Sequence, residues 1–82
     1  MYYVYILKSE KDKKLYIGYT DNLKIRFGEH TRGEVESTKH RRPMTLFYYE
    51  AYYDKKLAQQ RENKLKDFGS AYSGLIKRLN LI

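Results

Sequence analysis

The sequence predicts an α+β domain in which a small three-stranded antiparallel sheet is flanked by helices, in the order β-β-α-β-α-α. Three observations support this prediction. Two aromatic and β-branched runs open the chain with a polar stretch between them, a third such run follows the only proline, and two segments with helical spacing each run up to a glycine. The 82 residues allow one domain, which we place at 1–82.

The first two strands are predicted over residues 3–8 and 15–20, which are rich in tyrosine and isoleucine. The polar stretch between them is typical of a hairpin connection. A turn centred between residues 10 and 11 would place Tyr5 directly opposite Tyr16. We therefore expect the two phenol rings to lie side by side on one face of the sheet.

The first helix is predicted over residues 22–32. Either Thr20 or Asp21 can cap its start. Gly33 suits the left-handed conformation that commonly follows a helix end, so it is expected to stop the helix.

Arg26 and His30 lie four residues apart in this helix and therefore share a face. Leu23 and Phe27 form a neighbouring apolar stripe that can pack on the sheet. Arg26 and His30 are accordingly expected to border the groove between helix and sheet.

A basic loop is predicted over residues 34–44, and the third strand over 44–53. The strand is bulky enough for either the central or the closing position of the sheet. Cationic side chains of the loop are candidates for contact with nucleic acid: Lys39, His40, Arg41 and Arg42.

Two helices complete the prediction. Asp54 can cap the first of them, which runs to about Phe68 and is expected to stop at Gly69. The last is short, over residues 71–79, and its expected packing face consists of Leu75, Ile76 and Leu79.

Glu62 interrupts the apolar stripe of the long second helix, since it follows Ala58 by four residues and precedes Leu65 by three. A carboxylate at such a position needs a cation, a metal or several donors. The alternative is a surface ion pair with Lys66, worth about 0.2–0.5 kcal/mol. Other polar residues of the helix are expected to form a solvated basic face that can also meet phosphates: Arg61, Asn63, Lys64 and Lys66.

Composition points to an anionic partner. Seventeen Lys and Arg against ten Asp and Glu give a formal net charge of +7. Nucleic acid is the obvious candidate, although such a charge can also serve solubility alone. The absence of cysteine excludes disulfides and thiolate metal sites and favours a cytoplasmic location. No stretch approaches the roughly 20 apolar residues of a membrane span, so no membrane association is expected.

The candidate residues match the needs of phosphodiester hydrolysis. Glu62 offers an oxygen ligand to a hard cation such as Mg²⁺. Arg26 presents a planar fork to a phosphate oxygen. A tyrosine can take the proton of the attacking water only with help from a cation, since an unperturbed phenol titrates near ~10.

The segments Tyr3-Val4-Tyr5 and Tyr16-Ile17-Gly18 resemble the paired motif of the GIY-YIG nuclease superfamily. Arg26, His30 and Glu62 follow in the order of that family's later site residues. The resemblance covers nearly the whole chain and is closest to the small stand-alone bacterial branch of UPF0213-like proteins.

This resemblance implies an endonuclease that hydrolyses DNA phosphodiester bonds with Mg²⁺, or another divalent cation such as Mn²⁺. It further implies low sequence specificity and a role in DNA repair or recombination. The small size of the chain allows either a monomer or a homodimer. By the same analogy Tyr16 is the general base and Tyr5 its hydrogen-bonding partner. Arg26 would be the phosphate clamp, Glu62 the metal ligand and His30 an auxiliary phosphate contact.

Two positions depart from the family pattern: Tyr3 replaces a glycine, and Tyr19 stands where repair members often carry lysine. The alternative reading is therefore a catalytically silent nucleic-acid-binding module on the same scaffold. A third is a protein-interaction domain whose basic face is only solubilising.

Overall fold

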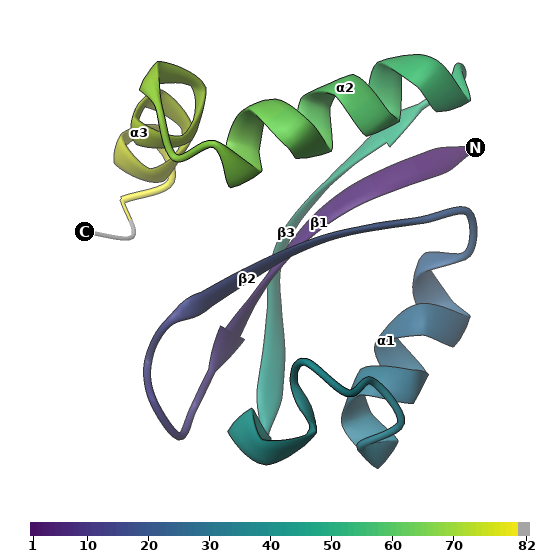
Figure 1. Ribbon diagram of the computed structural model, residues 1–82, viewed down its shortest axis with the longest axis vertical. Coiled ribbons are helices and arrows are strands. Elements are labelled where there is room, and N and C mark those ends of the chain that lie inside the picture. Colours follow the sequence, from purple (N-terminus) through teal and green to yellow (C-terminus); the bar gives the residue numbers. More distant parts are fainter. Residues whose placement is uncertain (81–82) are drawn as a thin grey trace.

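The computed structural model describes residues 1–80 and confirms the α+β architecture and the predicted order of elements (Figure 1). Its strands are β1 (Tyr2–Ser9), β2 (Leu15–Thr20) and β3 (Met44–Tyr52), and its helices are α1 (Leu23–Arg32), α2 (Lys55–Lys66) and α3 (Ser70–Arg78). A short 3₁₀ turn, Lys39–Arg41, lies in the loop before β3. Within the described residues, no helix is both long and apolar enough to cross a membrane.

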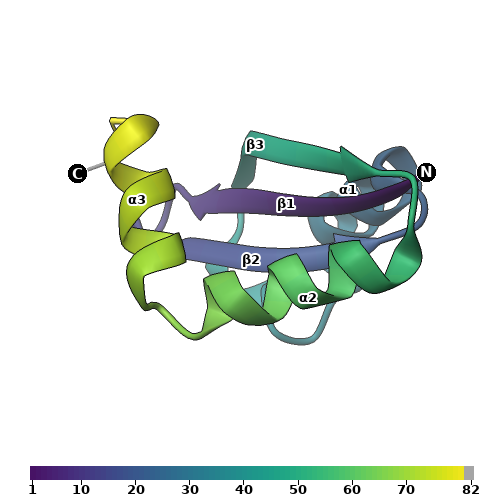
Figure 2. The same cartoon turned by 90° about the horizontal axis from the view of Figure 1, so that it is seen from above.

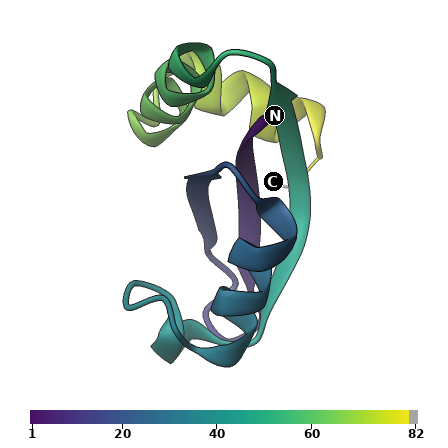
Figure 3. The ribbon, with the colours of Figure 1, turned by 90° about the vertical axis from the view of Figure 1, so that its right-hand side faces the viewer.

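The sheet separates two apolar clusters. Figures 2 and 3 show α2 and α3 over one face of the sheet and α1 on the other. Val4 and Ile6 of β1 pack with Ala58 and Leu65 of α2, whereas Tyr5 and its neighbours pack toward α1. Successive side chains of a strand alternate between faces, so β1 supplies both clusters.

The central strand is β1, because the strand order is β2-β1-β3. Of the two positions left open for the third strand, the structure shows the closing one, with β3 at one edge of the sheet. Burial explains the choice: four consecutive β1 residues, from Val4 to Leu7, are buried, while β3 alternates between covered and exposed positions. A strand covered on both faces needs a continuous apolar run, and only β1 has one.

The hairpin register differs from the prediction by two residues. Tyr5 pairs with Gly18, and Tyr16 pairs with Leu7. The Ser9 amide donates to the Lys14 carbonyl, and the Lys13 amide donates to the Ser9 carbonyl. The connection is therefore longer than the assumed turn, and Lys13 within it takes the left-handed conformation with φ 63°. A shift of two preserves the face of every side chain. The phenol rings of Tyr5 and Tyr16 therefore still share a face, with centroids 6.5 Å apart.

Asn22, rather than Thr20 or Asp21, caps α1, because its Oδ1 accepts from the Ile25 amide at 3.1 Å. Gly33 ends α1 as predicted, at φ 78°. Asp54 caps α2 as predicted, accepting from the Lys56 amide. These caps satisfy backbone donors that would otherwise lack partners.

The end of α2 also differs from the prediction. Phe68, not Gly69, takes the left-handed conformation, with φ 58°, and Gly69 instead begins α3 at φ −87°. The Phe68 ring packs edge-on against Tyr72 with centroids 4.8 Å apart. The spacing of residues within α2 does not reveal this contact, because Tyr72 belongs to α3.

Glu50 of β3 fixes α2 to the sheet. Its carboxylate accepts from the hydroxyls of Tyr48 and Tyr52 at 2.5 and 2.6 Å, and from two nitrogens of Arg61 at 2.9 and 3.0 Å. Burial alone would raise the pKa of Glu50, but the bonds from Arg61 and the two tyrosines hold it below its usual value. Arg61 is thus a structural ion-pair partner and not part of a solvated face, which corrects the sequence interpretation.

Candidate active site

A buried chain of hydrogen bonds begins at Tyr5. Its hydroxyl lies 2.9 Å from Nε2 of His30, and Nδ1 of His30 lies 2.7 Å from the hydroxyl of Thr38. The side chains of Tyr5, His30 and Thr38 have relative exposures of 1%, 0% and 0%. His30 is therefore held inside the protein, where it positions Tyr5.

This placement differs from the predicted role of His30 as a contact for phosphate. Both of its ring nitrogens already have partners inside the protein, and none of its surface is exposed. Burial, and next the nearby charge of Arg26, lower the pKa of His30 to about 4. A neutral imidazole, with one donor and one acceptor nitrogen, suits this chain of hydroxyl partners.

The state of His30 predicts an acid-sensitive fold. Its pKa of about 4 lies below the ordinary 6.5, so its stabilising effect is complete above pH 6.5 and is lost as the pH falls toward 4. We expect the free energy of unfolding to drop by up to about 3 kcal/mol across this window. Urea denaturation followed by circular dichroism at several pH values measures it.

The two histidines provide a matched control for that measurement. His40 is exposed, so His40→Gln should keep the wild-type pH dependence. His30→Gln should flatten it between pH 6.5 and 4. Equal slopes for wild type and His30→Gln would show that His30 does not control acid stability.

Tyr5 is a proton donor at neutral pH. Burial raises its pKa to about 12, Tyr16 and Glu62 add to the rise, and Arg26 partly opposes it. Because the hydroxyl stays protonated, Tyr5 can orient a partner but is a poor base. Tyr16 is only half-buried, and its hydroxyl accepts from Ser37 at 3.3 Å, which leaves it the more accessible phenol.

Gly18 makes room for the Tyr5 ring. A Cβ atom added to Gly18 would lie 2.3 Å from both Cζ and the hydroxyl oxygen of Tyr5, far inside contact distance. The ring therefore lies directly over the Gly18 backbone, where any other side chain would displace it. This explains physically why a tyrosine in one strand is matched by a glycine in the next.

Arg26 borders a groove beside β2. Its Nη1 lies 3.0 Å from Glu29 Oε1, and both side chains remain about one-third exposed. The groove encloses about 540 Å³, and its wall also includes Tyr19 and Lys55. Lys55 forms no ion pair with any residue in the 1–80 range, so its ammonium is available to an anion.

Sequence reasoning missed both Lys55 and Glu29. Lys55 opens α2 and is far from Arg26 along the chain, so only the packed structure brings the two cations to one groove. Glu29 offers a signal that could have been used, because it follows Arg26 by three residues on a helix.

Glu62 keeps one oxygen free within the described part of the chain. Its Oε2 pairs with Lys66 at 2.9 Å, its side chain is 18% exposed, and Oε1 has no recorded protein partner there. Its charge contributes to the raised pKa of Tyr5, so it acts on the same site from the α2 side. The predicted ion pair with Lys66 is thus present, and a second oxygen remains for a ligand.

A metal at Glu62 would have few protein ligands. No group of three His, Asp or Glu side chains converges anywhere in residues 1–80. Mg²⁺ commonly uses one or two carboxylates and completes its shell with water and substrate phosphates. Glu62 fits that pattern, whereas a fully protein-bound cation does not.

The predicted basic loop is used largely for structure. Arg41 pairs with Asp12 at 2.8 Å and also donates to the Lys14 carbonyl, while Arg42 donates to the Lys39 carbonyl at 3.0 Å. Figures 1 and 3 place this loop at the end of the sheet opposite α2. The loop and α2 are therefore separate surfaces, and on α2 Lys64 is exposed while Lys66 pairs with Glu62.

Comparisons with known proteins show one family. A family model described as the GIY-YIG catalytic domain matches residues 1–74. A UPF0213 protein of Staphylococcus haemolyticus is 44% identical over 68 residues, 82% of this chain and 82% of that protein. One of Clostridium perfringens is 45% identical over 67 residues, 80% of this chain and 71% of that protein. The solution NMR structure of a UPF0213 protein from Bacillus halodurans is similar, with a TM-score of 0.59 and 30% identity, covering 96% of this chain and 85% of the other.

Proposed function

This chain belongs to the GIY-YIG family, and from that premise we propose that it is a metal-dependent endonuclease acting on DNA with low sequence specificity. The observation that carries the proposal is the convergence of Tyr5, Tyr16 and Arg26 on one site that also feels the charge of Glu62. Tyr16 supplies an accessible phenol, Arg26 a phosphate-binding fork and Glu62 a carboxylate, while the buried Tyr5 positions the Tyr16 ring. Hydrolysis of a phosphodiester requires each of these functions.

Each residue has a distinct task in the proposed reaction. Tyr16 takes the proton of the attacking water, and protonated Tyr5, whose hydroxyl is bonded to His30, packs beside the Tyr16 ring and holds it in position. Arg26 holds a non-bridging phosphate oxygen, since its contact with Glu29 engages only Nη1. Glu62 would hold the divalent cation, which when bound supplies stabilisation of the charge that develops on the phosphoryl group.

Lys55 extends the phosphate-binding surface along the groove. Lys55 and Arg26 line the same groove, so a strand held at Arg26 can place a neighbouring phosphate at Lys55. Phosphate contacts position a nucleic acid without reading its sequence. Affinity should therefore fall with salt and vary little with sequence, as expected of an enzyme of DNA repair or recombination that acts on DNA structure.

The test is cleavage of supercoiled plasmid, branched DNA and single-stranded RNA with Mg²⁺, Mn²⁺ or EDTA. We expect DNA cleavage with either metal, none in EDTA, and a loss of at least about 10²-fold in Arg26→Ala. Arg32→Ala is the matched control, because Arg32 lies on the same helix and pairs with Glu34 at the surface. Binding without cleavage under all metal conditions would contradict the proposal.

The alternative function is a silent nucleic-acid-binding module. It is favoured by the ion pairs at the site, since Arg26 is paired with Glu29 and Glu62 with Lys66. A scaffold without catalytic activity would also keep such pairs. In that case Arg26→Ala would weaken nucleic-acid binding, and neither the wild type nor any variant would cleave DNA.

A further inference from the structure

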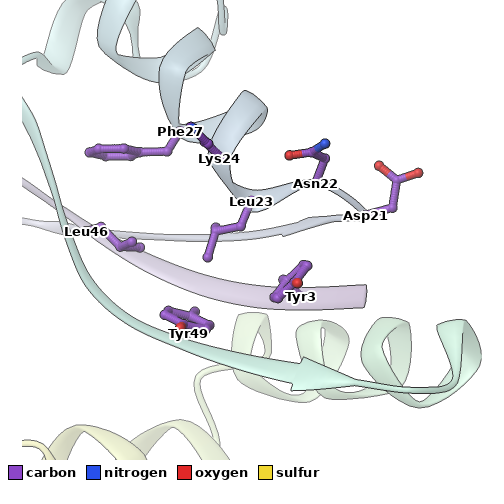
Figure 4. Close-up of a pocket in the computed structure, with 8 residues that line it drawn as sticks. All are labelled: Tyr3, Asp21, Asn22, Leu23, Lys24, Phe27, Leu46 and Tyr49. Atoms are coloured by element: carbon purple, nitrogen blue, oxygen red, sulfur yellow. The ribbon is translucent and has the colours of Figure 1, made fainter. Parts of the chain in front are cut away.

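A second hollow, separate from the Arg26 groove, lies on the α1 face of the sheet (Figure 4). It encloses about 490 Å³, which is within the usual range for small-ligand pockets. Its walls are apolar and mostly aromatic, and come from three elements: Tyr3 of β1, Leu23 and Phe27 of α1, and Leu46 and Tyr49 of β3. None of these side chains has a part in the proposed hydrolysis.

The aromatic rings leave a flat apolar surface open to solvent. Tyr49 is 52% exposed although it faces this hollow, and its ring meets that of Tyr3 edge-on, with centroids 6.1 Å apart and planes at 65°. An edge-on pair leaves ring faces free. A planar aromatic ligand can stack on such a face, as bases do on proteins that bind single strands.

Polar groups stand at one end of the hollow. Lys24 lines it and forms no ion pair within residues 1–80. Asp21 and Asn22 lie beside it, and the cap of α1 uses only Oδ1 of Asn22. An acceptor carboxylate, a donor amide and a cation suit the polar edge of a base and its phosphate.

The hollow adjoins the Arg26 groove. Asp21 and Asn22 line both the hollow and the Arg26 groove, so only the first turn of α1 separates them. From Asn22 to Arg26 the helix rises about 6 Å. A strand with one phosphate at Arg26 can therefore send an adjacent base over this turn into the hollow.

We propose that the hollow between α1 and β3 binds one unpaired nucleobase of the strand that occupies the active site. The inference rests on the proposed nuclease function and adds a substrate class to it. A base in a regular duplex must first be unpaired and flipped out, at a cost of about a few kcal/mol, so the favoured substrates are single-stranded, flapped or junction DNA.

The test measures binding without cleavage. Fluorescence anisotropy in EDTA compares a labelled flap oligonucleotide with versions that carry an abasic site at each flap position in turn. We expect one position at which loss of the base weakens binding about 5- to 100-fold. 2-Aminopurine at that position should lose fluorescence on binding, because stacking quenches it.

Tyr49 variants connect that base to the hollow. Tyr49→Ala should weaken binding of the intact oligonucleotide by the same factor, with no further loss on the abasic one, and Tyr49→Phe should bind as wild type. Tyr53→Ala is the matched control, because Tyr53 is 91% exposed and lies just beyond β3, outside the hollow. Thermal unfolding checks that every variant is folded.

Three outcomes would overturn the inference. In the first, removing the base at any flap position leaves the affinity unchanged. In the second, Tyr49→Ala weakens binding of the abasic oligonucleotide by the same factor as it weakens binding of the intact one. The third is a dimer in sedimentation velocity that Tyr49→Ala dissociates without any abasic effect, since a second copy would then fill the hollow. Cleavage in Mg²⁺ without base sensitivity rejects this inference alone, and base sensitivity without cleavage rejects only the nuclease.

Discussion

Replacing Glu62 with glutamine is expected to reduce DNA cleavage by at least about 10³-fold while leaving the protein folded and able to bind DNA. Glutamine keeps the shape of the side chain but removes the charge that a divalent cation requires. No cluster of three His, Asp or Glu side chains lies among residues 1–80, so the proposed metal site depends strongly on Glu62. Single-turnover nicking rates over a series of Mg²⁺ concentrations measure the effect.

Lys66 offers a control that separates the two roles of Glu62. Lys66→Met breaks the same 2.9 Å ion pair from the other side but leaves the carboxylate in place. If Glu62 binds the metal, Lys66→Met should cleave at close to the wild-type rate. If Glu62 serves only the ion pair, both variants lose about 0.2–0.5 kcal/mol of stability and neither loses cleavage, which would reject the metal-ligand assignment.

The hairpin shows what strand patterns predict well. The expected register was wrong by two residues because the length of the connection depends on local backbone geometry, including the left-handed Lys13. The face on which Tyr5 and Tyr16 lie was nevertheless predicted, because it depends only on the alternation of side chains along each strand. A register error of an even number of residues leaves every side chain on its predicted face of the sheet.

Long-range partners account for most of what the sequence did not reveal. Arg61 was expected on a solvated face, but Glu50 from another element holds it. His30 was expected at a phosphate, but Thr38 and Tyr5 enclose it. Helical spacing shows which residues share a face, and it does not show what a different element brings to that face. The same limit concealed Lys55 beside Arg26.

Gly18→Ala is the second variant with a large expected effect. A methyl group there would lie 2.3 Å from the Tyr5 ring, and the ring belongs to a buried cluster, so the ring or its neighbours must move. We expect a loss of about 1–3 kcal/mol in the free energy of unfolding, as for other overpacked cores. Cleavage should also fall by at least about 10²-fold, because displacing Tyr5 separates its hydroxyl from His30 and disturbs the neighbouring Tyr16 ring.

Two further variants identify the cause of that loss. Gly74→Ala adds the same methyl group in α3, where nothing lies within 4 Å, and should stabilise the helix by up to about 1 kcal/mol. Tyr5→Phe combined with Gly18→Ala removes one of the two atoms that the methyl group meets at 2.3 Å. The double variant should therefore recover part of the stability but none of the cleavage, since the donor hydroxyl is gone. If Gly18→Ala alone matches wild type in both stability and cleavage, the close passage of the Tyr5 ring over β2 does not position the active site.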